Sequence, residues 1–127
     1  MKTPLPEAID KLTILMLKRE RLLDDTQKQS VEREYQYYLR VIEAYRTEDG
    51  IDVKQKWIDD LHEANGKCWD LEAAIRQGRD AELGLEEVGR RAIQLRDLNK
   101  IRITAKNRIA EECGMDFFEV KVDHASE

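Results

Sequence analysis

Side chains that can bind or orient an anion recur at helical spacing in three separate segments of the chain. Successive members of each set lie three, four or seven residues apart, which places them on one face of a helix. The three polar stripes consist of Lys11, Lys18 and Arg21; of Asn65, Trp69, Glu72 and Arg76; and of Asn99, Arg102 and Lys106. Each stripe flanks an apolar one, so each is predicted to lie at the rim of a groove between helices.

The chemistry that these residue types favour is the recognition of an anionic small molecule. Arginine forms bidentate hydrogen bonds with phosphate and carboxylate groups, and the ring of Trp69 offers a flat face to a base or a sugar. Asp10, Asp70 and Glu72 are expected to orient the cations. The leading hypothesis is a non-enzymatic binding protein that holds a nucleotide or sugar phosphate in a polar groove between helices. One form of it is a protein that sequesters a nucleotide signal.

The same stripes fit a second hypothesis, a structural or adaptor bundle that acts through protein–protein contacts. In that case the charged residues form buried ion-pair networks that fix the register of the helices. The contact surface would consist of Tyr35, Tyr37, Tyr38, Tyr45, Phe118 and Val120. Adjacent tyrosines point to different faces of a helix, so at least one of Tyr37 and Tyr38 is expected to leave the core. The alternative is a wide core face with the hydroxyl groups at its edge.

An enzyme is the third and least favoured class, because the chain carries no recognisable catalytic motif. It lacks a glycine-rich phosphate loop, a GxSxG turn and an HExxH sequence. Its two cysteines, Cys68 and Cys113, form no CxxC pair and are expected to be reduced and free of metal. No catalytic residue, metal or cofactor is therefore predicted.

Charge and hydropathy narrow the choice of partners. The net charge is −5, whereas general binding of DNA or RNA needs a basic surface that neutralises phosphates. No apolar run approaches the roughly 20 residues that a membrane-spanning helix requires. The chain is expected to be cytoplasmic, with neither a nucleic acid nor a membrane as its partner.

The elements that position the polar stripes are predicted to be four long amphipathic helices. Apolar residues repeat at steps of three and four, and only six glycines and two prolines interrupt the chain. The predicted helices cover residues 6–24, 27–47, 53–77 and 85–113, with a loop at 79–84 and an extended C-terminal arm at 115–124. The fold class is thus all-α, an antiparallel bundle in one domain spanning residues 1–127. A homo-oligomer is expected, with a dimer as the first choice.

Four short blocks form a pattern that extends over most of the chain, with residues 27–47 as the least similar part. The blocks are EAIDKLTIL at residues 7–15, continuing to Lys18, Glu20 and Arg21; Asn65, Cys68-Trp69-Asp70-Leu71-Glu72 and Ile75-Arg76; Asn99, Arg102, Lys106 and Ile109; and Glu119 with Lys121. Together they resemble a family of all-helical bacterial and phage proteins that is classed as a domain of unknown function. Cys68 stands where that family more often has leucine. The resemblance implies an all-helical fold and adds weight to the polar stripes, and it implies no activity or ligand.

Overall fold

The computed structural model describes residues 3–21, 24–76 and 80–114, without the side chains of residues 75, 76 and 80–83. This part of the chain contains four helices, α1 (Leu5–Arg21), α2 (Asp25–Thr47), α3 (Gln55–Arg76) and α4 (Asp80–Glu112), and it has no strand. The predicted all-α bundle is therefore confirmed. The predicted arm at 115–124, with Phe118 and Val120, lies outside the described residues. None of the described helices is long and apolar enough to cross a membrane.

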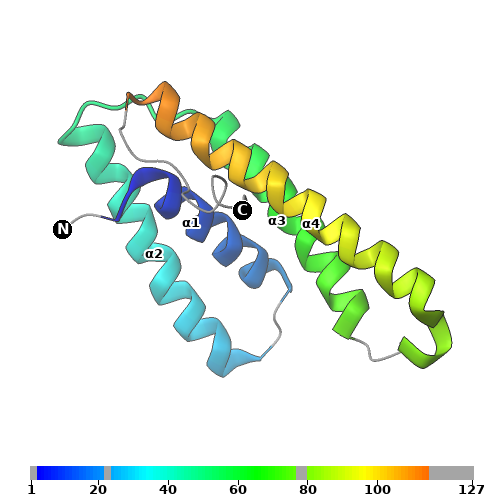
Figure 1. Cartoon of the computed structure of the whole chain (residues 1–127). Coiled ribbons are helices and arrows are strands. Elements are labelled where there is room, and N and C mark those ends of the chain that lie inside the picture. Colours follow the sequence, from blue (N-terminus) through cyan, green and yellow to red (C-terminus); the bar gives the residue numbers. More distant parts are fainter. Residues whose placement is uncertain (1–2, 22–23, 77–79, 115–127) are drawn as a thin grey trace.

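The bundle is built around α1, which packs against each of the other three helices (Figure 1). α2 lies on one side of α1, and the hairpin of α3 and α4 lies on the other (Figure 1). The C-terminal part of α3 and the N-terminal part of α4 extend past the end of α1, so that there they pack on each other alone (Figure 1). The hairpin is therefore covered by a third helix over only part of its length.

The hydrophobic core lies where the apolar faces of all four helices meet. Leu5, Ile9 and Leu12 follow one another at steps of four and three along α1, and all are at most 3% exposed. They pack in one cluster with Ile42, Tyr45, Val53, Trp57, Ile58, Leu61 and Ile109 of the other segments. Removal of these side chains from water is the main favourable contribution to folding. The buried side chains of α1 thus repeat along the chain with the period of an α-helix, as the apolar residues of the sequence do.

The helix boundaries differ slightly from the predicted ranges, and α2 begins at Asp25 and not at residue 27. α1 is described only to Arg21, and Asp24, which the first range included, has an extended backbone. Its side chain accepts a hydrogen bond of 2.9 Å from the Thr26 backbone N–H, which makes it the N-cap of α2. α3 begins at Gln55 and not at residue 53. Val53 precedes the helix and is buried in the core. After α2, Gly50 has a φ of +65°, a conformation that ends helices and that glycine adopts without strain.

The predicted loop at 79–84 is wrong for residues 80–83. Residues 80–83 are already helical, and the break falls at Gly84, whose φ of +83° and ψ of 158° are not helical. The regular part of α4 therefore starts after Gly84, close to the predicted residue 85. A side chain at position 84 would be strained at this φ.

Alanine substitutions at two glycines of α4 are expected to change stability in opposite directions. Gly84→Ala should lower the free energy of unfolding by about 1–2 kcal/mol, because residues with a Cβ resist positive φ. Gly89→Ala should raise it by up to about 1 kcal/mol, because alanine favours a helix interior and nothing lies within 4 Å of the added Cβ. Urea unfolding followed by circular dichroism measures both. Equal effects at the two positions would contradict the kink at Gly84.

The tyrosines of α2 do not form one exposed face. Tyr45 is buried and its hydroxyl donates a 2.8 Å hydrogen bond to the Thr3 carbonyl. Tyr35 and Tyr38 pack partly buried against the core, and the Arg19 guanidinium lies 4.0 Å above the centre of the Tyr35 ring. Tyr37 is 49% exposed, which confirms that one of the adjacent rings leaves the core.

Candidate functional site

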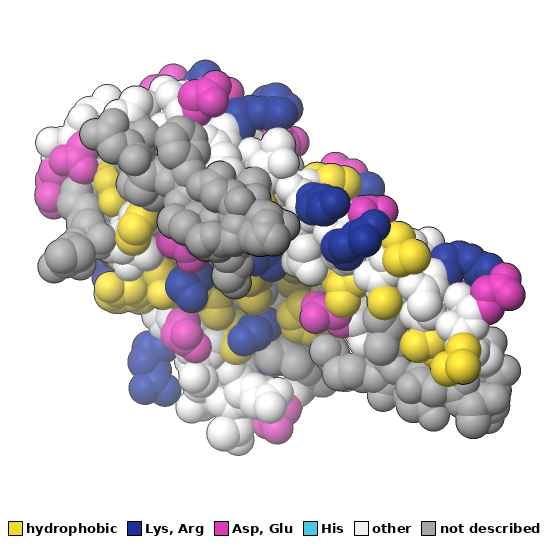
Figure 2. Space-filling view, viewed as in Figure 1, with side chains coloured by type: hydrophobic (Ala, Val, Ile, Leu, Met, Phe, Trp, Pro, Cys, Tyr) yellow, Lys and Arg dark blue, Asp and Glu magenta, His cyan; other side chains and the backbone are white. Residues whose placement is uncertain are grey.

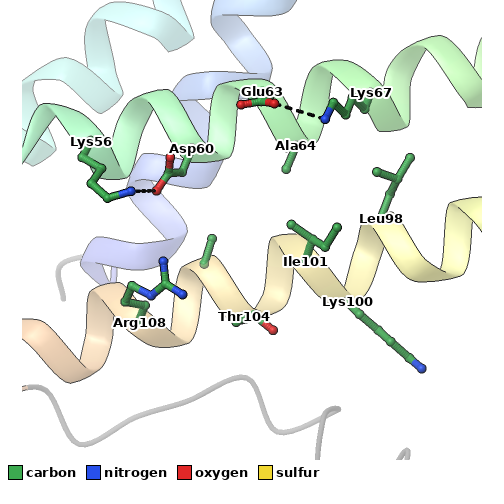
Figure 3. A pocket seen from close by; sticks show the side chains of 11 residues that line it. Lys56, Asp60, Glu63, Ala64, Lys67, Leu98, Lys100, Ile101, Thr104 and Arg108 are labelled. Carbon is green, nitrogen blue, oxygen red and sulfur yellow. Dashed lines mark hydrogen bonds and ion pairs between the residues drawn. The ribbon is translucent and has the colours of Figure 1, made fainter.

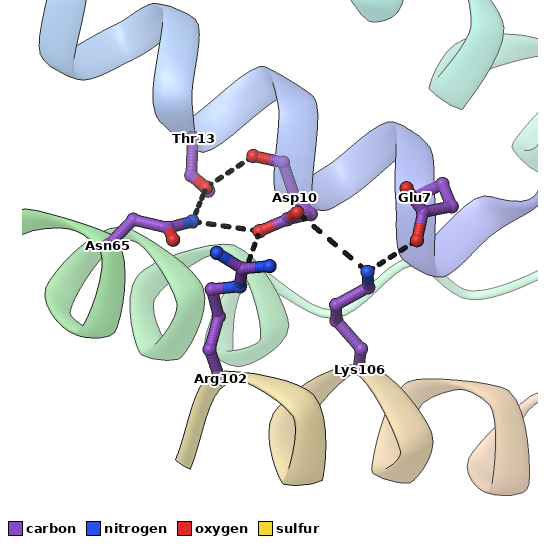
Figure 4. A network of polar contacts seen from close by, with 6 residues as sticks. All are labelled: Glu7, Asp10, Thr13, Asn65, Arg102 and Lys106. Atoms are coloured by element: carbon purple, nitrogen blue, oxygen red, sulfur yellow. Dashed lines mark hydrogen bonds and ion pairs between the residues drawn. The ribbon is translucent and has the colours of Figure 1, made fainter. Parts of the chain in front are cut away.

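A network of polar side chains lies at the junction of α1, α3 and α4 (Figure 4). We call it the polar junction; it consists of Glu7, Asp10, Thr13, Asn65, Arg102 and Lys106. Asp10 is at its centre and is only 5% exposed. The Asn65 side-chain amide donates hydrogen bonds of 2.9 Å to Asp10 Oδ1 and to Thr13 Oγ1. The Thr13 hydroxyl in turn donates a 2.8 Å hydrogen bond to the Asp10 carbonyl.

Two cations from α4 face these acceptors (Figure 4). Arg102 Nε lies 3.8 Å from Asp10 Oδ1. Lys106 Nζ donates to the Glu7 carboxylate and lies 3.9 Å from Asp10 Oδ2. Lys106 is 5% exposed, and a buried ammonium is tolerated only when carboxylates or hydrogen-bond acceptors compensate its charge. The junction thus pairs two cations with two carboxylates.

Helical spacing explains how separate segments supply these groups. Glu7, Asp10 and Thr13 are three residues apart on α1, so they share the face that turns toward α4. Arg102 and Lys106 are four residues apart on α4 and project toward that same face. The N-terminal half of α1 therefore meets the C-terminal half of α4 through charges as well as through apolar side chains such as Ile109.

A second charged contact forms at the other end of α1. Arg21 donates a 2.6 Å hydrogen bond to Asp70 Oδ1, and its guanidinium lies 5.6 Å from the centre of the Trp69 ring. Close by, a Cβ on Gly66 would meet Leu17 Cδ2 at 3.6 Å, so α1 and α3 are in contact there. Arg21 is eleven residues from Asp10, which corresponds to about 16 Å along a helix. The predicted site residues therefore gather in two places and not in one cleft.

The structure places the predicted site residues as follows. Asp10, Asn65, Arg102 and Lys106 meet in the polar junction, and Arg21, Trp69 and Asp70 meet at the second contact. Four others, Lys11, Lys18, Glu72 and Asn99, make no hydrogen bond or ion pair with a described residue, and Lys11 and Glu72 are exposed. The Arg76 side chain lies outside the described part.

Two members of the junction, Glu7 and Thr13, are absent from the predicted stripes. The available signal was their spacing, three residues before and three residues after Asp10. That signal is weak, because Glu7 also fits a charge in the first turn of a helix and Thr13 fits an ordinary core position.

The two cysteines are free, and neither is placed for chemistry. Burial raises the pKa of the Cys68 thiol, and the nearby Arg102 opposes this only in part. Burial likewise raises the pKa of Cys113. Because the thiolate is the nucleophilic form, both thiols are poor nucleophiles at neutral pH. Within the described ranges, no group of three or more His, Cys, Asp or Glu side chains is arranged to hold a metal ion.

Trp57→Phe is expected to raise the pKa of Glu112 toward its ordinary value. In the folded chain the Trp57 indole N–H donates a 2.8 Å hydrogen bond to Glu112, which lowers the pKa of that carboxyl from 4.5, and Lys54 lowers it further. Phenylalanine keeps the ring but removes the donor. An NMR titration of the Glu112 carboxyl carbon measures the shift, with Trp69→Phe as the control. An unchanged pKa in Trp57→Phe would contradict the role of the indole.

A groove runs between α3 and α4 and forms two adjoining cavities of about 440 and 670 Å³. We call it the α3–α4 groove. Its first half is lined by Lys56, Asp60, Glu63, Ala64, Lys67, Leu98, Lys100, Ile101, Thr104, Ala105 and Arg108 (Figure 3). Its second half is lined by Lys67, Asp70, Leu71, Ala74, Glu87, Arg91, Gln94, Asp97, Leu98 and Ile101. Leu98 and Ile101 point from α4 toward α3 (Figure 3), so the groove has an apolar centre and charged rims.

Comparisons with models of protein families, with curated protein sequences and with solved structures find no match.

Proposed function

We propose that this protein is a non-enzymatic helical module that acts through protein–protein contacts made by the α3–α4 groove. In this proposal the polar junction has a structural role and fixes how α1 packs on α3 and α4. We further propose a cytoplasmic location and membership of the all-helical family that the sequence resembles. The two free cysteines support the location, because thiols stay reduced in the cytoplasm.

The observation that carries the proposal is the charge balance of the polar junction. Arg102 and Lys106 face Asp10 and Glu7, and Arg21 is paired with Asp70. A phosphate needs donors whose charge is not already compensated. An anion at the junction would have to displace carboxylates that are hydrogen-bonded to Asn65 and Lys106. The arrangement therefore favours ion pairs that hold helices together over a site for a phosphate.

The α3–α4 groove supports the second half of the proposal. Ile101 is 57% exposed at its centre although it is a large apolar residue. Figure 2 shows hydrophobic side chains reaching the surface along this hairpin between positively and negatively charged ones. An apolar centre with a charged rim is the usual composition of a protein–protein interface.

One observation favours the anion-binding hypothesis as a second candidate. The Arg102 side chain is 29% exposed, and its buried Nε has no hydrogen-bond partner among the described residues. An anion bound on the exposed side of this guanidinium would add a partner for the side chain without displacing Asn65.

A thermal-shift experiment separates the two candidates. A panel of nucleotides and sugar phosphates is expected to leave the melting temperature of the chain unchanged. A ligand that binds only the folded state would raise the melting temperature. The proposal would be overturned in favour of anion binding if a ligand raised the melting temperature of the wild-type chain and of Lys11→Ala but not that of Arg102→Ala. Lys11 is an exposed cation on α1 and serves as the control.

Site-specific photocrosslinking in the cells that make the protein tests the contact surface directly. A photoreactive amino acid replaces Ile101 in one variant and Ile93 in the control. Both positions lie on α4 and are similarly exposed, at 57% and 51%, but only Ile101 lines the groove. A discrete protein adduct is expected at position 101 and none at position 93. Adducts at neither position, or at both equally, would contradict the proposed surface.

A further inference from the structure

We infer that the part of α4 from Leu85 to Ile101, which we call the distal segment, separates from α3 and unwinds as one unit while the rest of the bundle stays folded. This local opening does not depend on the proposed function. Its consequence does: the second half of the α3–α4 groove exists only while the segment is packed, so opening would regulate binding there. Three features carry the inference: burial, the direction of the polar contacts and the space between the helices.

The first feature is a sharp change in burial along α4. The described residues from Gly84 to Ala105 include none that is buried, whereas Lys106, Ile109 and Ala110 are each at most 5% exposed. The change follows the extent of α1, which covers only part of the α3–α4 hairpin (Figure 1). A helix in a folded chain is stabilised mainly by burial of its apolar face. The distal segment therefore opens at a lower free energy than the core.

The second feature is that the ion pairs of the distal segment lie within α4 itself. They are Arg90 with Glu86 and Glu87, Arg91 with Glu87, and Arg96 with Asp97. Among the described residues, one hydrogen bond of the segment crosses to α3, from the Arg91 guanidinium to the Ala74 carbonyl over 3.3 Å. Beyond the segment, Arg102 and Lys106 are paired with carboxylates of α1. Polar contacts therefore do little to hold the distal segment on α3.

The third feature is the space between the two helices. The cavity in the second half of the groove, which the distal segment lines with Glu87, Arg91 and Gln94, has a volume of about 670 Å³, against about 440 Å³ in the first half. Ile101 lines both halves and is still 57% exposed. Atoms that border such a space lack the van der Waals contacts that hold packed helices together. The distal segment is therefore loosely packed on α3.

Once it has left α3, the distal segment is expected to unwind. Most helical stability in proteins comes from packing and not from the helix propensity of the residues. Gly89 lies inside the segment and lowers that propensity further. At its start, Gly84 has a φ of +83° and interrupts the helix, so the preceding turn does not support the segment. Opening therefore exposes backbone amides to water, which hydrogen exchange detects.

Native-state hydrogen exchange of the full chain, measured for each amide by NMR at several low urea concentrations, is the test. After correction for intrinsic rates, the amides of residues 91–101 should exchange at least about tenfold faster than those of residues 8–17 in α1. Their rates should be similar to one another and should depend less on urea, because local opening exposes less surface than global unfolding. Protection should then rise abruptly between residues 101 and 106, where α4 meets α1.

Two substitutions separate local opening from global unfolding. Ile9→Val trims a wholly buried side chain of α1, so it should speed exchange in α1 by about fivefold and leave residues 91–101 unchanged. Gly89→Ala should slow exchange of residues 91–101 by up to about fivefold, because alanine makes unwinding of the segment less favourable. Circular dichroism confirms that both variants are folded.

Equal exchange rates in α1 and in residues 91–101, with the same urea dependence, would overturn the inference, since the chain would then unfold as a single unit. So would a gradual rise in protection along α4, which is the pattern of fraying from a helix end. An Ile9→Val variant that speeds both regions equally, or a Gly89→Ala variant without effect on residues 91–101, would also contradict it. The proposed function can survive each of these results, because photocrosslinking at position 101 tests it independently.

Discussion

Replacing Asp10 with alanine is expected to lower the free energy of unfolding by about 3 kcal/mol, because the change leaves Arg102 without a carboxylate and the buried Lys106 with Glu7 alone. Asp10 is 5% exposed and lies 3.8 Å from Arg102 Nε and 3.9 Å from Lys106 Nζ. It also accepts the hydrogen bond that Asn65 donates. Urea unfolding at neutral pH, followed by circular dichroism, measures the loss.

The matched control is Asp70→Ala, which removes the carboxylate that pairs with Arg21 at the other end of α1. The Asp70 side chain is 70% exposed, so its pair with Arg21 should contribute at most about 1 kcal/mol. Adding Arg102→Leu to Asp10→Ala should recover part of the loss, since the guanidinium is no longer left unpaired. If Asp10→Ala costs no more than Asp70→Ala, the polar junction does not hold the bundle together.

Asn65→Asp is expected to destabilise the fold by about 3 kcal/mol or more at neutral pH, although it hardly changes the size of the side chain. The wild-type amide donates 2.9 Å hydrogen bonds to Asp10 Oδ1 and Thr13 Oγ1. In the variant a carboxylate oxygen takes the place of the donor and faces a second carboxylate. Both the lost hydrogen bonds and the repulsion between like charges oppose folding.

The pH dependence of this variant provides an internal check. Two carboxyl groups that share a buried site raise the pKa of one of them in the folded state above its unfolded value. The folded state then binds more protons than the unfolded state, so stability is lost as the pH rises through the folded pKa and regained as it falls. Unfolding at pH 7 and pH 5 should show recovery at the lower pH. Asn99→Asp, which changes the same residue type outside the junction, should show neither effect beyond about 0.5 kcal/mol.

The helices themselves were predictable because their causes are local in the chain. The apolar steps of Leu5, Ile9 and Leu12, the Asp24 cap and the turn at Gly50 each depend on residues a few positions apart. The error at residues 80–83 has a local cause as well. A polar, glycine-flanked segment is typical of a loop, whereas here residues 80–83 are helical and Gly84 alone leaves the helical conformation.

The sequence identified four of the six members of the polar junction but not the way in which they pair. Helical spacing selected Asn65, Arg102 and Lys106, because residues three or four apart share a face. Asp10 was expected as a carboxylate that orients the cations. In the structure, Lys106 of the polar junction is paired with Glu7 and Asp10. Glu7 and Lys106 are 99 residues apart in the chain, and Arg21 and Asp70 are 49 apart.

Short-range regularities in the amino-acid order were sufficient to define an all-helical chain, most of its helix ends and the faces on which its charged residues lie. The tertiary structure decided which cation pairs with which carboxylate, through the way in which α1 crosses the α3–α4 hairpin. Ion pairs and hydrogen bonds depend on distances in space and not on separation along the chain. The same packing left the N-terminal part of α4 without a third helix to cover it. No local sequence pattern encodes this gap in the packing, because it arises from the difference in length between the α1–α2 hairpin and the α3–α4 hairpin.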